Sequence, residues 1–256
     1  MHQATAILPI FEPTLFQLAP TTPPALYPWQ QFAPLYFALL EAREANLENV
    51  LIVSHQHIDM LLAQVQYWQN HHAPLKDLCI QVQVSPEPLE NEGDVLWAIR
   101  SQLRADHSYY YVDCLNHCNK SQATRYFWPL GSMQEAIGQG SCVHFGLHAI
   151  RPSQTEDYTL VQLDGMGLVK GLQYQAQSDR AISNLAFAGR MIFKAEALTS
   201  FWQQGALGCD WPLWLDYLQS KGSGYVSGSL IGKDGWHDLA QRHNWLAQQQ
   251  NEKILY

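Results

Sequence analysis

The chain has 256 residues, 47% of them hydrophobic and 15% charged, so it is long and apolar enough to bury a substantial core. Its formal net charge is -8 and no run of Lys or Arg occurs, which excludes general binding to nucleic acids or anionic membranes. No apolar stretch of about eighteen residues and no signal-like N-terminus is present, so we expect a cytoplasmic protein without a membrane span.

Strand-like and helix-like runs alternate in the first half of the chain. Runs rich in β-branched, aromatic and other apolar residues predict strands at 5–10, 49–54, 78–84 and 108–112. Apolar residues at helical spacing predict helices over 33–47, 58–68 and 94–103. This alternation is typical of βαβ units with a parallel sheet, in which ligands gather beyond the carboxyl ends of the strands.

From Ser141 onward the strand candidates follow one another more closely. They lie at 142–150, 158–169, 171–176 and 185–193, and they are joined by turn-forming Asp-Gly and Gly-rich segments. A helix at 211–220, a strand at 224–232 and a helix at 239–250 complete the chain. We expect a mixed or antiparallel extension of the first sheet. Because no repeat or linker marks a boundary, we predict one domain over 1–256, with halves 1–140 and 141–256.

The loop after the first predicted strand reads FEPTLFQLAPTTPP, and it contains no glycine and no basic residue. The first Lys or Arg of the whole chain is Arg43. Backbone N–H groups freed by glycine, together with cations, are what a phosphate-binding loop needs. This loop is therefore expected to pack against the protein instead of holding phosphate.

Several other residue groups are candidates for a site, but a structural role explains each of them more simply. The Cys and His residues in 114–118 and 142–144 lack the Cys-x-x-Cys spacing of zinc sites, so we favour buried cysteines and solvent-facing histidines over a metal. The run Tyr109–Tyr111 and the stripe Trp202, Trp211, Trp214 and Tyr217 are expected to be core, with a stacking pocket or a partner surface as the alternatives. No nucleophile elbow, His-Glu-x-x-His helix or Walker loop occurs.

The segment SNLAFAGRMIFKAEAL, residues 183–198, resembles the bacterial UTP:glucose-1-phosphate uridylyltransferases, in which a similar S-N-L-A-x-x-G-R strand enters the sugar side of the site. Other segments follow in the family's order: 7–10 and 49–55 as its first strands, 87–99 as the segment contacting the base, 158–174 as a hairpin and 232–248 as the metal-binding turn and helix. The resemblance implies an α/β, Rossmann-like nucleotidyltransferase fold with a mixed central sheet flanked by helices.

The resemblance also implies site residues. On the nucleotide side they are Glu87 and Gly93, and on the sugar side they are Asn184, Gly189 and Asp210. For Asp210 we favour an N-cap role over sugar binding. Asp113 and Asp238 match the family's two metal-binding aspartates, which makes Mg²⁺ a candidate cofactor. A structural role explains them as well: Asp113 ends a strand, and Asp238 caps the last helix.

Three cation positions of the family are empty in this sequence. Phe16 stands about where the Arg of the phosphate loop belongs, Pro24 replaces the lysine of the next motif, and Tyr174 to Ala176 replace the Glu-Lys-Pro motif. The family's reaction places negative charge on two phosphates and a pyrophosphate, and each lost stabiliser costs about 3 kcal/mol or more. The sequence therefore predicts a member of this fold that has lost catalysis.

Three hypotheses about function follow. The first is a pseudoenzyme that binds a nucleotide sugar or a protein partner. The second is an active sugar-phosphate nucleotidyltransferase with a non-standard phosphate site, whose cations come from Arg190, Lys194 or another chain. The third is an obligate subunit that stabilises an active homologue or a homo-oligomer. The sequence does not say which sugar, base or partner is involved.

Overall fold

A computed structural model describes residues 4–11, 22–28, 32–118, 129–205, 208, 210–221, 226–231 and 236–239. The strands are β1 (Ala4–Ile10), β2 (Asn49–Ser54), β3 (Cys79–Val84), β4 (Ser108–Val112), β5 (Asn116–Cys118), β6 (Val143–Ala149), β7 (Thr159–Leu163), β8 (Val169–Tyr174), β9 (Leu185–Lys194), β10 (Val226–Leu230) and β11 (Trp236–Asp238). The helices are α1 (Pro34–Glu44), α2 (Ile58–His71), α3 (Glu92–Ala98), α4 (Pro129–Gly138), α5 (Ala195–Trp202) and α6 (Trp211–Ser220). Short 3-10 turns are η1 (Pro24–Leu26), η2 (Ala73–Leu75), η3 (Arg100–Gln102) and η4 (Pro152–Asp157).

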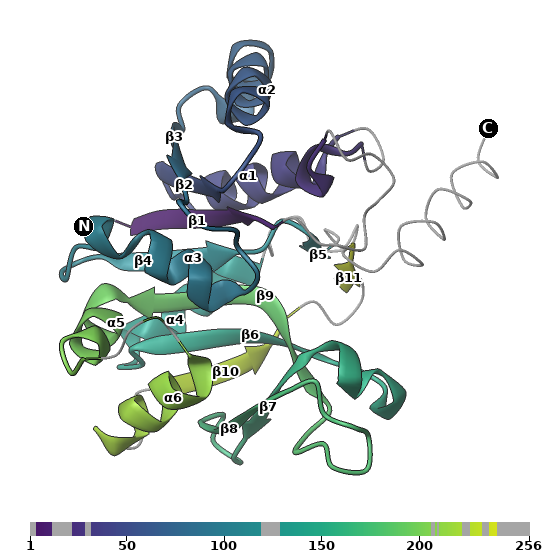
Figure 1. The fold of residues 1–256 in the computed structure, drawn as a ribbon, viewed down its shortest axis with the longest axis vertical. Coiled ribbons are helices and arrows are strands. Elements are labelled where there is room, and N and C mark those ends of the chain that lie inside the picture. Colours follow the sequence, from purple (N-terminus) through teal and green to yellow (C-terminus); the bar gives the residue numbers. More distant parts are fainter. Residues whose placement is uncertain are drawn as a thin grey trace.

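One mixed sheet runs through both halves of the chain (Figure 1). Its strand order is β10-β6-β9-β4-β1-β2-β3, and the hairpin of β7 and β8 joins it through β9. Neighbours among β4, β1, β2 and β3 are parallel, whereas β9 is antiparallel to both β4 and β6. The predicted α/β class and the mixed central sheet are thus confirmed, and the second half does extend the sheet of the first.

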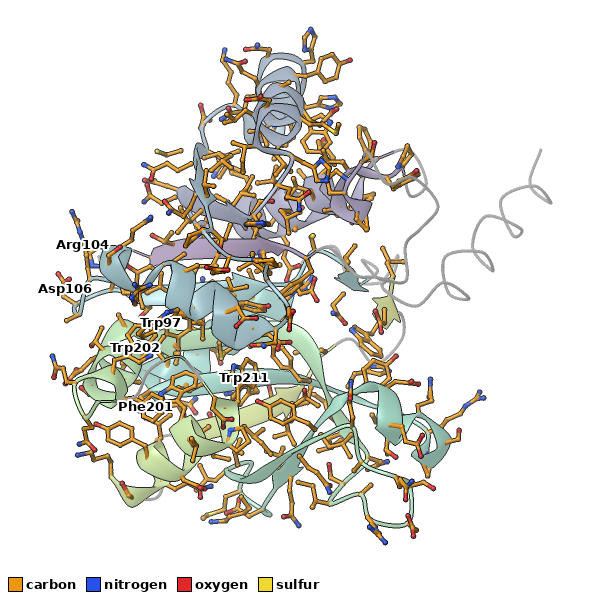
Figure 2. The ribbon with its side chains drawn as sticks, in the orientation of Figure 1. Trp97, Arg104, Asp106, Phe201, Trp202 and Trp211 are labelled. Atoms are coloured by element: carbon orange, nitrogen blue, oxygen red, sulfur yellow. The ribbon has the colours of Figure 1, made fainter. Side chains whose placement is uncertain are left out.

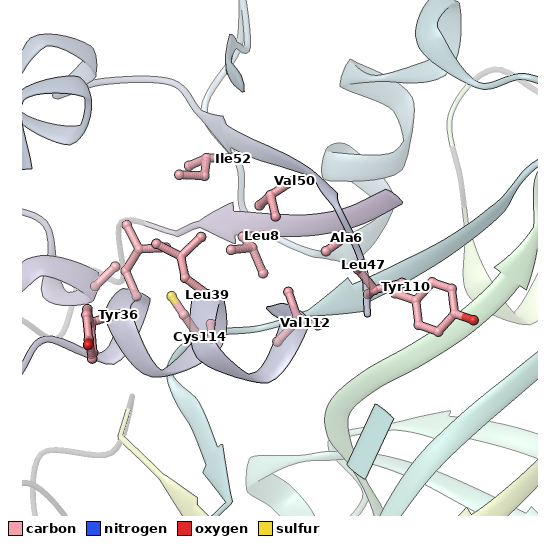
Figure 3. Close-up of a cluster of buried hydrophobic side chains, with 14 of the residues drawn as sticks. Ala6, Leu8, Tyr36, Leu39, Leu47, Val50, Ile52, Tyr110, Val112 and Cys114 are labelled. Carbon is pink, nitrogen blue, oxygen red and sulfur yellow. The ribbon is translucent and has the colours of Figure 1, made fainter. Parts of the chain in front are cut away.

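Helices cover both faces of the sheet, so its central strands are apolar on both sides. In β1, Ala6, Leu8 and Ile10 pack with α1, α2 and α4, whereas Ile7 points to the face that carries α3, α5 and α6. Figure 3 shows the first of these clusters around Leu8, Leu39 and Val112. A strand buried on both faces reads as a continuous apolar run, which is why β1 and β2 were recognisable in the sequence.

The aromatic residues singled out in the sequence belong to this core. Trp211 and Trp214 are among the largest fully buried side chains, and Tyr109, Tyr110 and Tyr111 are all buried in β4. The core interpretation is therefore confirmed for the tyrosines and for Trp211 and Trp214, whereas Trp202 and Tyr217 are only partly buried at the edge of the core. The hydroxyl of Tyr111 has no hydrogen-bond partner within the described part of the chain and is buried below the face that α3 covers.

Element boundaries differ from the predictions in two informative places. The expected helix over 94–103 begins two residues earlier, at Glu92, and breaks into the 3-10 turn η3 after Ala98. The strand expected over 158–169 ends at Leu163, and a turn separates it from β8. The short strands β5 and β11 and the helices α4 and α5 were not predicted. No helix among the described residues is long and apolar enough to cross a membrane. Residues 240–250 of the expected helix at 239–250 and the loop at Glu12–Phe16 lie outside the described residues.

Candidate functional site

A large cavity lies beyond the carboxyl ends of β1 and β4, and its volume is about 1070 Å³. Phe11 follows β1 and Asp113 follows β4, and both line it. The segment before and within α3, the start of β7 and the end of β8 provide further walls, and Asp210 lies at the start of α6. The cavity therefore occupies the place where parallel α/β sheets bind ligands.

The described wall of this cavity is acidic. It contains six carboxylic acids and neither Lys nor Arg, the acids being Glu90, Glu92, Asp94, Asp113, Asp157 and Asp210. Aromatic side chains contribute as well, from Phe11, Trp97, Tyr158 and Tyr174. Such a wall attracts cations and sugar hydroxyls and repels an unaccompanied phosphate.

Two of these acids cap helices. Asp94 accepts hydrogen bonds from the N–H groups of Glu90 (2.9 Å) and Asn91 (3.1 Å), and the Asn91 side chain accepts one from the Asp94 N–H, which completes a capping box for α3. The Leu213 N–H donates to Asp210 Oδ1 at 3.0 Å, so Asp210 is the N-cap of α6. The favoured cap role of Asp210 is confirmed, and the same residue also lines the cavity.

Glu92 is the acid whose protonation is most affected by its surroundings. Burial at the first turn of α3 raises the pKa of its carboxyl to about 7, and the charges of Asp113 and Asp94 act in the same direction. No motif in the sequence distinguishes Glu92 from the other acids. Its importance depends on α3 packing over the end of β4, which a single sequence does not reveal.

Asp113 is buried and firmly held at the floor of the site. Its Oδ1 accepts from the Leu115 N–H at 2.9 Å, and its Oδ2 accepts from Asn116 Nδ2 at 2.6 Å. Burial raises the pKa of Asp113 above its usual range, and these two hydrogen bonds and the positive charge of Arg190 counteract that effect in part.

Asn116 contacts three of the predicted site residues, which are Asp113, Asp238 and Gly189. Its side chain holds Asp113, and its backbone pairs with Asp238 in the small sheet of β5 and β11. Gly189 adopts a positive φ of 68°, and a Cβ there would lie 2.6 Å from the Cβ of Asn116. Only glycine allows β9 to pass so closely, so this glycine has a structural reason to be there.

Asp238 lies behind the wall of the cavity. It is buried, and it forms a hydrogen bond with Tyr158, which is part of the wall. Burial and the charge of Asp238 raise the pKa of Tyr158. Figure 1 shows β5 and β11 together at the end of the sheet toward which β1 points. The fold thus brings Asp113 and Asp238 to the same end of the molecule.

The remaining predicted site residues are divided between the cavity and its surroundings. Gly93 is buried in the wall at α3. Glu87 and Asn184 are exposed and are not among the described wall residues, and the carbonyl of Asn184 accepts a hydrogen bond from the Ile150 N–H. Tyr174 and Gln175, which replace the family's Glu-Lys-Pro motif, do line the cavity.

The two cations considered for an unusual phosphate site are both placed elsewhere. Arg190 is buried and its Nη2 lies 2.8 Å from Glu41 Oε2, with Nε at 3.1 Å from each oxygen of the same carboxylate. Its Nη1 donates to the carbonyl of Asp113 at 2.8 Å. Lys194 pairs with Ser108 at the start of β4, which is the opposite end of the sheet.

No group of three or more His, Cys, Asp or Glu side chains that would hold a metal ion occurs within the described residues. Cys114 and Cys142 are buried thiols whose pKa is raised by burial, as expected. The expectation that the histidines face solvent is wrong for His144, which is buried and hydrogen-bonded to Ser227 and Ser229. The side chains of His117 and Cys118 lie outside the described part.

No protein-family model and no curated protein sequence matches the chain. Solved structures do match. A UDP-glucose pyrophosphorylase complexed with UDP-glucose is 12% identical, with a TM-score of 0.79 over 98% of this chain and 99% of that one. An apo UDP-glucose pyrophosphorylase is 13% identical, with a TM-score of 0.81 and the same coverage. The enzyme from Acinetobacter baumannii is 14% identical, with a TM-score of 0.76 over 98% of this chain and 94% of that one.

At these identities the likeness concerns the fold. It agrees with the strand order, with the cavity beyond the carboxyl ends of β1 and β4, and with the resemblance seen at residues 183–198. The chain has the Rossmann-like fold of the sugar nucleotidyltransferases.

Proposed function

We propose that this protein binds a nucleotide sugar in the acidic cavity and does not catalyse nucleotidyl transfer. The observation that carries the proposal is the cavity wall, which has six carboxylic acids and no Lys or Arg among its described residues. A wall of this kind suits the hydroxyl groups of a sugar, and its aromatic side chains suit a base or a sugar ring. It does not suit a triphosphate that must be activated.

The chemistry of nucleotidyl transfer explains why catalysis is not expected. Attack on the α-phosphate builds up negative charge that cations and N–H groups must stabilise, and each missing stabiliser slows the reaction about 10²- to 10³-fold. Arg190 is engaged by Glu41 and Lys194 lies at the other end of the sheet. The loop after β1 adds no cation, because its sequence contains none.

A divalent cation would reconcile the acidic wall with a diphosphate. Each carboxylate oxygen of Asp113 accepts one hydrogen bond from the protein. Each oxygen keeps a second lone pair that a cation or its bound water could use. Asp238 lies at the same end of the fold. Mg²⁺ usually takes one or two carboxylates together with water and phosphate oxygens, and this donor set fits that pattern. When bound, the cation would neutralise the diphosphate.

Binding and turnover are tested separately. Isothermal titration calorimetry with UDP-glucose, with Mg²⁺ and with EDTA, is expected to give binding only in the presence of Mg²⁺. Asp113→Asn should abolish that binding. Asp216→Asn removes an exposed acid from α6 and serves as the matched control, which should bind like the parent protein. Absence of binding to every nucleotide sugar tested would overturn the proposal and direct attention to protein partners.

The competing hypothesis is an active transferase that obtains its cations from a partner chain. The retention of Asp113 and Asp238 at one end of the fold favours it. It predicts pyrophosphate release from UTP and glucose 1-phosphate, and loss of that activity in Asp238→Asn. Our proposal predicts no release with the purified protein, whether or not it forms oligomers.

A further inference from the structure

A second cavity lies at the amino ends of the parallel strands, away from the acidic cavity, with a volume of about 320 Å³. The described residues of its wall are Thr5, Asn49, Val50, Leu51, Cys79, Gln81, Gln102, Arg104, His107 and Tyr109. Figure 2 shows Arg104 and Asp106 together at this edge, on the side where β1 begins. No role follows from the proposed function for any of these residues.

The floor of this second cavity is a row of polar side chains at one level of the sheet. Tyr109, Thr5, Asn49 and Cys79 are successive cross-strand partners on β4, β1, β2 and β3. Partners in parallel strands point to the same face, so these four side chains stand side by side. Four adjacent strands thus offer hydroxyl, amide and thiol groups to one small space.

The segment after η3 closes over this row and is fixed in place. The Tyr109 hydroxyl donates to the Gln102 carbonyl at 3.2 Å and accepts from the Arg104 N–H at 3.0 Å. The backbone that carries Arg104 is therefore tied to the floor of the cavity. A ligand would meet a formed site, which reduces the entropy cost of binding.

The charge of this cavity is opposite to that of the first. Among its described wall residues are Arg104 and His107 and no Asp or Glu, although the chain has a net charge of -8. The acid next to it, Asp106, is exposed, and its Oδ1 lies 2.9 Å from His107 Nδ1. This hydrogen bond lowers the pKa of Asp106.

We propose that this second cavity binds a small oxyanion, the phosphate or carboxylate group of a small metabolite. Arg104 supplies a charged donor, and the amides of Asn49 and Gln81 and the hydroxyl of Thr5 supply neutral ones. The volume lies at the lower end of the range for ligand pockets, which is too small for a nucleotide sugar. The inference does not depend on the proposed function of the acidic cavity.

Cys79 provides a direct test, because its thiol is exposed in the wall while Cys114 and Cys142 are buried. Alkylation of Cys79 by neutral iodoacetamide is followed by peptide mass spectrometry, in inorganic phosphate, in succinate, and in NaCl of equal ionic strength. We expect alkylation to become about tenfold slower once the binding anion reaches about ten times its Kd. Protection by phosphate alone assigns a phosphate ligand, and protection by succinate alone assigns a carboxylate.

Substitutions separate a specific site from a general salt effect. Arg104→Gln should weaken protection about tenfold or more, because it removes a charged hydrogen bond to the ligand. Arg180→Gln removes the same charge from an exposed position on another segment and should leave protection unchanged. If Arg104→Gln does not fold, His107→Gln takes its place. Equal protection by NaCl, no protection by either anion, or full protection in the folded variant would each overturn the proposal.

Discussion

The buried ion pair between Arg190 and Glu41 is expected to support both the fold and the site. Arg190 on β9 reaches across to α1, where it makes three hydrogen bonds of 2.8 to 3.1 Å with the Glu41 carboxylate. Its Nη1 also holds the Asp113 carbonyl at 2.8 Å. We predict that Arg190→Met destabilises the protein and weakens ligand binding at Asp113.

The magnitude follows from burial. Arg190 is 2% exposed and Glu41 0% exposed, so removal of the guanidinium leaves a carboxylate without its charge partner in the core. Breaking such a pair costs about 3–5 kcal/mol. For a chain of this size each kcal/mol corresponds to about 2–4 °C, so the Tm should fall by about 6–20 °C. The double variant Glu41→Leu with Arg190→Met removes both charges and should recover much of the loss.

Urea unfolding followed by tryptophan fluorescence measures the free energy of unfolding for the parent protein, both single variants and the double variant. A double-mutant cycle then gives the coupling energy of the pair. A loss below about 1 kcal/mol in Arg190→Met would refute the reasoning, because it would mean that the Glu41 carboxylate is stabilised in the core even without Arg190.

Three further predictions concern stability. Gly189→Ala forces a side chain against Asn116 at a φ of 68°, so the free energy of unfolding should fall by about 1–3 kcal/mol in urea titrations, and an unchanged value would contradict the close packing. Trp214→Ala empties a fully buried site and should cost about 3–5 kcal/mol by the same assay; a loss below about 1 kcal/mol would contradict its place in the core. The pKa of Glu92 is raised to about 7 from 4.5, so the folded state holds this proton more tightly and stability should fall as pH rises through that window. The pKa of His144 is lowered to about 4 from 6.5, so this group makes the folded state more stable as pH rises to about 6.5. Glu92→Gln removes the opposing effect of Glu92, so the stability of this variant should rise with pH up to about 6.5. A decline of stability over this window in Glu92→Gln would contradict the attribution of the parent's decline to Glu92.

The central strands of the sheet were readable from the sequence because they are buried on both faces. The predicted strands at 49–54 and 108–112 coincide with β2 and β4, and the predicted helix at 211–220 coincides with α6. Asp113 and Asp238 were named from a resemblance, and the pairing of β5 with β11 brings them to one end of the fold. The elements β2, β4 and α6 carry local signals of their own in the sequence, namely apolar runs, helical spacing and a helix cap.

Other features depend on contacts between distant segments, which a single sequence does not encode visibly. The raised pKa of Glu92 arises where α3 covers the end of β4, and the pairing of Arg190 with Glu41 spans 149 positions. From the sequence alone, Arg190 was a candidate cation for a phosphate, because the sequence does not show that Glu41 on α1 pairs with it. The strands β5 and β11 span three residues each, too few to show a period.

The central claim is that the acidic cavity binds a nucleotide sugar without catalysing its formation. The most direct measurement is pyrophosphate release from UTP and glucose 1-phosphate with Mg²⁺, on a protein preparation already shown by calorimetry to bind UDP-glucose. We predict binding with no release above the rate without protein. Release at an ordinary enzymatic rate, abolished in Asp238→Asn, would contradict the account and establish an active transferase.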